Sequence, residues 1–520
     1  MALVRLGRAC LGTEMQKGSP TVRRLAVLVL GASIITASGC GSDPNVIRMQ
    51  STPAPCTAGS TFVPASVPLI ELSCDSFTNS SSQHRTEVEP GSFAFANTMI
   101  ASFQVGRIFG GGASDIGYVR STDGGATWST GLLPGVTTFQ GGGSYSAVSD
   151  TSVIYDAAHG VWLIASLPIS NSSIAVAVSR STDGGVTWSN PILVAQGADL
   201  DKNWITCDNG QTSPHYGNCY MEWDDHGNNN LVYMSASSDG GLTWSPSSAV
   251  AGANGLGGQP LVQPSGVVIV PFLTNGSFLE SFSSTDGGTT WSTPVQIAFA
   301  DQHAVGGNLR SDALPSAEID GAGEVYVVWQ DCSFRSACSS NDLVISTSTD
   351  GVTWTGPSRI PIDPVTSAVD HFIPGLGIDL TTSGSSAHLG LTYYYYPQAN
   401  CTASTCALYV GFVSSSDGGN TWSVPTTLAG PMSLGWLPST SSGAMVGDYI
   451  ATSFSGGKAY GFFAVAQANS GTMFDQAIYT TQAGFDVAAR AGVGRSLGER
   501  PRVSRRISSS KPALRAPVRR

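Results

Sequence analysis

An eight-residue motif, Ser-x-Asp-Gly-Gly-x-Thr-Trp, is the feature that most constrains the fold of this chain. It occurs six times, once in a copy that is one residue short. The aspartates are separated by 60, 56, 47, 64 and 67 residues. Repeats of this length, filled with short β-rich segments, indicate propeller blades of about four strands each. The copies are Ser121–Trp128, Ser181–Trp188, Ser237–Trp244, Ser284–Trp291, Ser348–Trp354 and Ser415–Trp422.

The motif has the chemistry of a turn between two strands. Asp and Ser side chains accept hydrogen bonds from turn N–H groups, and glycine supplies positive φ. Apolar runs such as Ile174–Val178 precede the motif, and Thr-Trp begins the next strand. Strand, Asp-Gly turn and strand predict a hairpin whose indole packs between neighbouring sheets. We therefore expect structural rather than catalytic roles for Asp123, Asp183, Asp239, Asp286, Asp350 and Asp417.

The composition agrees with an all-β fold. Of 520 residues, 62 are Gly and 28 are Pro, and only 12% are charged. The exposed faces of a helical bundle need Lys, Glu and Arg, so the low charge argues against one. Hydrophobic residues at 41% and 11 Trp are ample for a core, which excludes wholesale disorder.

The repeated pattern is the Asp-box, or bacterial neuraminidase repeat, and over about residues 85–485 the chain resembles the sialidase-like family. The resemblance implies a β-propeller and a glycoside hydrolase of the exo-α-sialidase type, acting on glycans at the cell surface. Asp-box propellers also include non-catalytic proteins, so a propeller that binds glycan or protein is the alternative. In this family the box lies on the face away from the active site.

Strand starts that follow the boxes predict seven blade units. The last unit lacks a box, and its fourth strand is expected from residues 61–70, which would close the ring without an exposed edge. Sialidases have six blades, so six is the alternative to the favoured seven. The predicted starts are residues 88–90, 149–150, 201–204, 259–260, 310–312, 370–372 and 447–449.

These strand starts gather polar side chains at one mouth of the propeller, where ligands commonly bind. Paired carboxylates serve as acid and base in glycoside hydrolysis, and aromatic rings stack on sugars. The structural alternative is that the carboxylates bond blade backbones or hold Ca²⁺. The predicted catalytic carboxylates are Glu89, Asp201, Asp312 and Asp370, with Asp150 and Asp448 nearby. The adjoining substrate-binding candidates are Lys202, Trp204, Arg310, His371 and Tyr449.

Sialidases hold the substrate carboxylate with three arginines and use a tyrosine–glutamate nucleophile pair and an aspartic acid. The resemblance therefore implies an arginine triad, best matched by Arg107, Arg310 and Arg335, and an axial tyrosine, assigned to Tyr395. The early Arg-Ile-Pro motif of the family is missing, because Phe109 follows Arg107-Ile108. An acidic mouth also disfavours an anionic substrate unless arginines contact it directly.

Residues 1–39 predict a lipoprotein signal peptide. Arg23 and Arg24 precede an apolar stretch, residues 25–37, that is too short to span a membrane. The sequence from Ala37 to Cys40 resembles a lipobox with Cys40 as the lipidated residue, and an ordinary secretory signal is the alternative. We expect an exported protein that is lipid-anchored to the bacterial cell envelope or secreted.

Eight further cysteines form four close sequence pairs, and export makes disulfides the default. They are Cys56 and Cys74, Cys207 and Cys219, Cys332 and Cys338, and Cys401 and Cys406. No Cys/His spacing predicts zinc. No metal or cofactor is required, although structural Ca²⁺ stays open. Segment Asp224–Asn230 has side-chain oxygens that could bind Ca²⁺, but its composition primarily predicts a polar hairpin loop.

The charge is unevenly distributed along the chain. Residues 40–485 contain 33 acidic and 10 basic residues, a net charge of −23, whereas residues 486–520 contain ten Lys/Arg. The acidic body would repel phosphate backbones, which argues against nucleic acid as a partner. We expect a linker with a closing strand at 40–84, the propeller at 85–485 and a disordered basic tail at 486–520. The expected partner is a glycan or glycoprotein, the membrane contact is the lipid anchor only, and the protein is expected to be a monomer.

Overall fold

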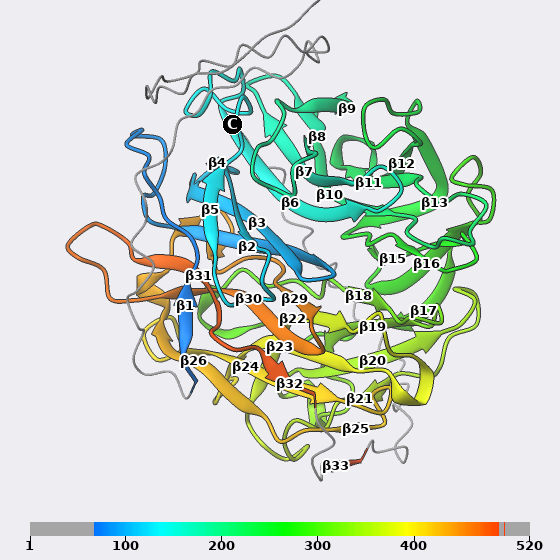
Figure 1. Cartoon of the computed structure of the whole chain (residues 1–520). Helices are drawn as coiled ribbons and strands as arrows, with labels where there is room; N and C mark the ends of the chain where they lie inside the picture. The colour runs from blue at the N-terminus through cyan, green and yellow to red at the C-terminus, as the bar shows by residue number, and fades with distance from the viewer. Residues whose placement is uncertain (1–66, 488–492, 495–520) are drawn as a thin grey trace, which may run out of the picture. The chain divides into compact units, whose positions relative to one another are not determined.

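The computed structural model describes residues 67–487 and 493–494. The predicted signal peptide, Cys40, Cys56 and most of the basic tail lie outside these residues, so those predictions stay untested. Short antiparallel strands are the main secondary structure of the described chain, and its helices are single 3-10 turns (Figure 1). None of the helices in this part of the chain has the length and apolar character that a membrane span requires.

The first two sets of four strands form one continuous sheet. β4 joins β6 through Ala113 and Val148. The strands are β2 (Glu87–Phe95), β3 (Thr98–Arg107), β4 (Ala113–Ser121) and β5 (Ser129–Leu132), then β6 (Ala147–Asp156), β7 (Val161–Ile169), β8 (Ile174–Ser181) and β9 (Ile192–Gly197).

The next two sets are joined in the same way, through β13 and β15. The strands are β10 (Leu200–Cys207), β11 (Cys219–Asp225), β12 (Leu231–Ser237) and β13 (Ser248–Leu256), then β14 (Leu261–Val262), β15 (Val268–Thr274), β16 (Phe278–Ser284) and β17 (Val295–Phe299).

Three sets form separate sheets. The fifth contains β18 (Ser316–Ile319), β19 (Val325–Asp331), β20 (Asp342–Ser348) and β21 (Ser358–Arg359). The sixth contains β22 (Asp370–Ile378), β23 (Leu389–Tyr396), β24 (Ala407–Ser415) and β26 (Thr426–Ser433). The last contains β29 (Ala451–Ser455), β30 (Lys458–Ala466), β31 (Gln476–Thr481) and β1 (Leu69–Glu71).

The remaining elements are short. The strands among them are β25 (Thr421–Trp422), β27 (Ser439–Thr440), β28 (Gly443–Ala444), β32 (Phe485–Asp486) and β33 (Val493–Gly494). The 3-10 helices are η1 (His226–Asn228), η2 (Gly306–Asn308), η3 (Ser336–Cys338), η4 (Gly384–Ser386) and η5 (Leu434–Trp436).

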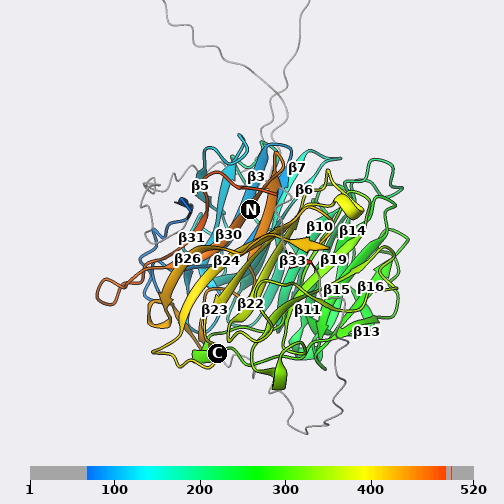
Figure 2. The ribbon, with the colours of Figure 1, turned by 90° about the horizontal axis from the view of Figure 1, so that it is seen from below.

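The first strands of the sets make a closed ring. β2, β6, β10, β14, β18, β22 and β29 contact one another in that order, and β29 contacts β2 (Figure 1). Figure 2 shows the strands after a turn of 90°. Glycine permits the closest approach, because a Cβ at Gly377 in β22 would lie 2.3 Å from the Thr452 carbonyl oxygen in β29. The predicted all-β propeller is confirmed. The count of seven blades stays a prediction, because four of the sets are joined in pairs.

The fourth strand of the last set comes from the beginning of the described chain. Leu69–Glu71 pairs antiparallel with Tyr479–Thr481 of β31. The closing strand is expected within residues 61–70, of which residues 61–66 lie outside the described chain. The structure places the pairing at the end of that segment and just beyond it.

The Asp-boxes close hairpins as predicted. Asp123 accepts hydrogen bonds from the Thr127 hydroxyl at 2.6 Å and the Thr127 N–H at 2.9 Å, and these donors lower its pKa to about 2. Ser121 Oγ accepts from the Gly125 N–H at 2.8 Å. The Asp-box carboxylates are hydrogen-bonded within their own turns, which supports the predicted structural role. Equivalent Thr contacts hold Asp183, Asp239, Asp286 and Asp417, and in the short copy Asp350 accepts from backbone N–H groups.

Three of the four predicted cysteine pairs are disulfides: Cys207–Cys219, Cys332–Cys338 and Cys401–Cys406. Cys74 is also disulfide-bonded, and its predicted partner, Cys56, lies outside the described residues. Disulfides persist in oxidising compartments, so these bonds agree with the predicted export.

Candidate functional site

β-Bulges at equivalent places present charged side chains from three inner strands. Strand pairing slips between Val88 and Gly91 in β2, between Ser149 and Ser152 in β6, and between Asp201 and Trp204 in β10. Within these slips, Glu89, Asp150 and Lys202 have φ values of 57°, 34° and 49°. A bulge re-aims a side chain, and positive φ in a residue other than glycine is common at functional sites. β22 repeats the bulge with the apolar Ile373, whose φ is 50°.

Lys202 is the centre of this axial cluster. Its Nζ lies 3.1 Å from Asp150 Oδ1, 3.1 Å from Asp448 Oδ2 and 3.7 Å from Glu89 Oε1. All four residues are buried. Burial lowers the pKa of Lys202, but the three carboxylates raise it by a larger amount. The pKa of Lys202 is therefore well above its ordinary value. The ammonium group therefore stays charged and holds three strands together electrostatically.

Two of the three predicted arginines lie beside the cluster. Arg310 contacts Asp448 through two nitrogens, with Nε donating to Oδ1 at 2.7 Å. The buried Arg107 donates from Nη1 to Gln104 Oε1 at 3.2 Å and to the Gly112 carbonyl at 2.6 Å. The Gln104 amide in turn donates to Glu89. Burial, followed by the charge of Arg310, lowers the pKa of Arg107.

The axial carboxyl groups titrate over different ranges. Burial raises the pKa of Glu89 to about 7, although Lys202 opposes the shift. Burial also acts upward on the pKa of Asp448, but Arg310 and Lys202 outweigh it and hold that pKa well below the ordinary value. Neighbouring carboxyls with separated pKa values are the arrangement that acid–base chemistry uses.

A hollow of about 300 Å³, part of it open to solvent, lies next to the cluster. Its lining includes the ion pair of Asp150 and Lys202, together with Asn203, Trp204 and Tyr449. The Trp204 and Tyr449 rings meet edge to face at 5.4 Å, and Lys202 Nζ lies 5.0 Å from the centre of the Tyr449 ring. Aromatic rings beside polar side chains suit a sugar. A second hollow of about 260 Å³, near Cys74 and Phe103, has no acidic or basic side chain among the described residues that line it.

The Tyr449 hydroxyl is engaged with the backbone rather than with a catalytic carboxylate. It accepts from the Thr151 N–H at 2.9 Å and donates to the Thr151 carbonyl at 3.2 Å. Burial, followed by the charge of Glu89, raises the pKa of Tyr449 well above its ordinary value. This environment does not activate the phenol as a nucleophile.

Asp201 is the more accessible carboxyl at this end of β10, with 32% of its side chain exposed. Desolvation by the surrounding protein, followed by the charge of Asp150, raises its pKa. His226 Nε2 lies 3.3 Å from Asp201 Oδ2 and 3.3 Å from Asp224 Oδ2. Asp224 is fully buried, and burial raises its pKa well above the ordinary value. The imidazole therefore lies between an accessible and a buried carboxyl, in the predicted hairpin loop between β11 and β12.

A second buried network contains three residues that were predicted to lie at the mouth. Arg335 bonds Asp342 through Nε at 2.8 Å and pairs with Asp363 at 2.8 Å. Asp370 Oδ1 accepts from the backbone and side-chain nitrogens of Asn341 at 2.7 and 2.8 Å. His371 Nδ1 lies 3.3 Å from the Asn341 carbonyl oxygen, and burial lowers the pKa of His371.

The predicted arginine triad is therefore not formed, because the Arg335 guanidinium is used by Asp342 and Asp363. The predicted axial position of Tyr395 is also wrong. Its hydroxyl bonds Thr427 at 2.8 Å and its ring stacks on Tyr409 at 5.2 Å, so the side chain faces β24 and β26. Asp312 lies exposed in the loop before β18. The catalytic roles of these residues have no support from their positions.

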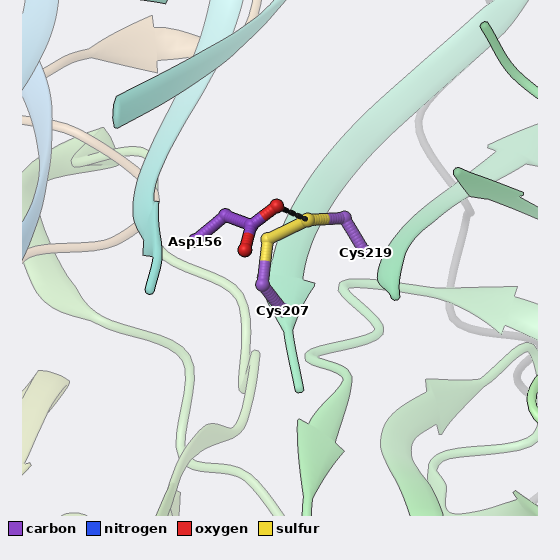
Figure 3. A group of neighbouring side chains, drawn as sticks. All are labelled: Asp156, Cys207 and Cys219. Carbon is purple, nitrogen blue, oxygen red and sulfur yellow. Dashed lines mark hydrogen bonds between the residues drawn. A yellow bond between two sulfur atoms is a disulfide. The ribbon is translucent and has the colours of Figure 1, made fainter. Parts of the chain in front are cut away.

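Within the described part of the chain, three clusters bring together side chains of the types that bind metals, but their surroundings do not suit a cation. Figure 3 shows Asp156 beside the Cys207–Cys219 disulfide, whose sulfurs are oxidised, whereas metals bind the thiolate. Asp156 also lies 2.6 Å from His159 Nδ1. The same reasoning applies to Asp301 with Cys332 and Cys338. The cluster of Asp342, Asp363 and His371 contains two guanidinium groups, Arg335 and Arg359, which would repel a cation.

Sequence reasoning missed the amide side chains at the axis. It found Glu89, Lys202, Trp204, Arg310 and Tyr449 from strand starts and charge. Gln104 belongs to a second strand and reaches the axis only through Glu89. Asn203 carries no charge or motif, and only its place in the β10 bulge, beside Lys202, would have indicated it.

The comparisons with known proteins agree with the repeats. Residues 80–297 match the BNR repeat-like domain. The matched part of the chain is similar to this family. It contains the first four Asp-boxes and the strands that supply Glu89, Asp150 and Lys202. A search of the curated proteins found no match.

Solved structures similar to the chain include glycan-processing proteins at low identity. A Hadza microbial sialidase is 19% identical over 60% of this chain and 64% of its own, with a TM-score of 0.39. A leech intramolecular trans-sialidase is 15% identical over 74% of this chain and 65% of its own, with a TM-score of 0.37. An ulvan lyase from a new polysaccharide lyase family is 10% identical over 78% of this chain and 96% of its own, with a TM-score of 0.46. The chain thus spans just under two thirds of the two sialidase structures.

Proposed function

We propose that this BNR repeat-like protein is a glycoside hydrolase whose active site is the axial cluster and the adjoining hollow. The observation that carries the proposal is that Asp201, whose pKa is raised, begins the β10 bulge whose residues Lys202 and Trp204 line the hollow together with Asp150. The two carboxyls come from neighbouring inner strands. Burial, followed by the charge of Asp150, raises the pKa of Asp201, and glycoside hydrolysis uses a carboxylic acid of raised pKa near a second carboxyl group.

Asp201 is the general acid and Asp150 the carboxylate partner in this proposal. The acid gives its proton to the glycosidic oxygen as the bond to the anomeric carbon breaks. The carboxylate stabilises the positive charge on the sugar or takes a proton from the attacking water. Lys202 holds Asp150 in place at 3.1 Å, and His226 holds Asp201 at 3.3 Å. Trp204 offers a ring face for the sugar.

The exo-α-sialidase type is the finer form of this proposal and rests on the Asp-box resemblance. Arg107 and Arg310 lie near the cluster, as a carboxylate-binding arginine pair would. Arg310 is already bonded to Asp448 through two nitrogens, however, and Tyr449 is not activated as a nucleophile. Both observations weaken the sialidase form more than they weaken glycoside hydrolysis in general.

A non-catalytic glycan-binding propeller is the second candidate. The observation that favours it is the mutual pairing of the axial charges, in which Lys202 is shared by three carboxylates. Ion pairs at the axis would stabilise the ring of inner strands without taking part in catalysis.

The deciding experiment measures fluorophore release from 4-methylumbelliferyl α-sialoside and from uncharged 4-methylumbelliferyl glycosides. We expect turnover, and a loss of about 100-fold or more in kcat/KM for Asp201→Asn and Asp150→Asn, as for removal of an acid–base group. Asp475→Asn, in an exposed pair with Arg85, is the matched control and should keep full activity. Glycan-array binding without turnover of any substrate would reject the hydrolase and leave the binding propeller.

A further inference from the structure

Asn203 is a buried amide that lines the hollow and lacks partners within the described chain. The residue is 2% exposed, and neither Oδ1 nor Nδ2 has a hydrogen-bond partner among the described residues. Buried polar groups in native proteins are nearly always bonded, because an unpaired one costs stability. Asn203 lies in the β10 bulge between Lys202 and Trp204, and all three residues line the same hollow.

The charged side chains that line the hollow are paired with each other, and Arg107, which donates to Gln104 and the Gly112 carbonyl, is buried and does not belong to the lining. Of the described residues in its lining, only Asp150 and Lys202 have acidic or basic side chains, and they bond each other at 3.1 Å. Arg310 is held by Asp448, and Arg335 by Asp342 and Asp363. A bidentate carboxylate site needs a guanidinium fork that is not already used by a protein carboxylate. The described part of the lining offers no such group.

We propose that Asn203 binds the hydroxyl groups of an uncharged sugar that stacks on Trp204. An amide presents one acceptor and two donors, and adjacent sugar hydroxyls can satisfy both sides at once. The hollow is small and partly open to solvent, which suits contact with one sugar unit at the end of a glycan rather than a long enclosed chain. The inference rests on the proposed glycan-directed function and names its substrate class: a neutral sugar, in place of the anionic sialic acid of sialidases.

The first experiment compares uncharged, carboxylated, sulfated and amino-bearing glycans on an array, using the full protein with disulfides intact. The expected result is that the strongest binders are uncharged. Stronger binding of carboxylated glycans, such as 3′-sialyllactose over lactose, would overturn the inference. Binding of no glycan would overturn it together with the proposed function. Binding of neutral glycans without turnover would reject only the hydrolase.

The second experiment measures affinity for the strongest neutral binder by calorimetry in Asn203→Leu and in a matched variant, Asn341→Leu. We expect Asn203→Leu to weaken binding by about tenfold or more, as loss of one to two hydrogen bonds would. Its melting temperature should not fall, because neither amide atom bonds another described residue. Asn341 bonds His303 and Asp370, so its variant should lose melting temperature. Unchanged affinity in a folded Asn203→Leu would refute the assignment, and a fall in its melting temperature like that of Asn341→Leu would identify a structural amide.

Discussion

Glu89 makes the stability of the propeller depend on pH in a way that a single substitution can isolate. Burial raises the pKa of Glu89 from 4.5 to about 7, so the folded state favours the protonated carboxyl. The stabilisation is fully present below pH 4.5 and is lost as the pH rises through 7. The side chain introduced by Glu89→Gln is neutral at every pH, so the variant does not lose this stabilisation as the pH rises.

The size of this effect on the free energy of unfolding follows from the shift in the pKa of Glu89. Each pKa unit corresponds to about 1.4 kcal/mol, so the shift of Glu89 is worth about 3 kcal/mol in the free energy of unfolding. The variant also changes the contacts with Gln104 and the Asp448 N–H, because an amide cannot accept at both ends. That change is independent of pH. The part of the difference that varies with pH therefore reports the Glu89 proton.

Urea unfolding of the wild type and Glu89→Gln at intervals from pH 4 to pH 8 measures this difference. We expect the variant to gain about 3 kcal/mol relative to the wild type across that range. Asp123→Asn is the control: its turn hydrogen bonds lower the pKa of Asp123 to about 2, so its contribution is lost only as the pH falls below about 4, and its difference should be flat from pH 5 to pH 8. A Glu89→Gln difference that changes by less than about 0.5 kcal/mol between pH 4 and pH 8 would refute the reasoning.

Two further predictions concern the axis and the ring. Lys202→Met leaves Asp150, Asp448 and Glu89 without their shared cation, and the free energy of unfolding should fall by about 3–5 kcal/mol, as for a broken buried pair. Arg85→Met, which removes an exposed pair with Asp475, should cost less than about 1 kcal/mol in the same urea titration. Gly377→Ala would press a Cβ against the Thr452 carbonyl at 2.3 Å and should lower stability by about 1–3 kcal/mol or more, measured by thermal unfolding. Gly356→Ala, with no described atom within 4 Å of the new Cβ, should have almost no effect, and equal effects of the two glycine variants would contradict the close approach of β22 and β29.

The repeats made the fold predictable because their chemistry is local. Ser, Asp, Gly and Thr within eight residues satisfy one another, as the contacts of Asp123 with Thr127 show. The spacing between boxes then sets four short strands per repeat, and short strands with buried faces must pack on neighbours. Close cysteine pairs such as Cys332 and Cys338 are predictable for the same reason, since their partners are near in sequence.

The site was predictable only in part, because long-range contacts decide which strand ends meet and how each side chain is used. Strand starts correctly brought Glu89, Lys202, Arg310 and Tyr449 together. They did not reveal that Arg335 and Asp370 belong to a separate network, since the partners of these residues come from loops and from β20. Tyr395 shows the same limit within one strand, because the pairing of β23 with β22 and β24 decides which of its side chains face the axis.

The sequence by itself determined the hairpins, the repeat and the all-β propeller, because turn chemistry and strand patterning act over a few residues. Tertiary structure alone decided that an ammonium group from β10 meets carboxylates from β2, β6 and the start of the last set. It also decided that Asn203 lies beside Trp204 without a partner among the described residues. The physical reason is that bulges, burial and charge pairing depend on groups up to several hundred residues apart, and no local pattern records them.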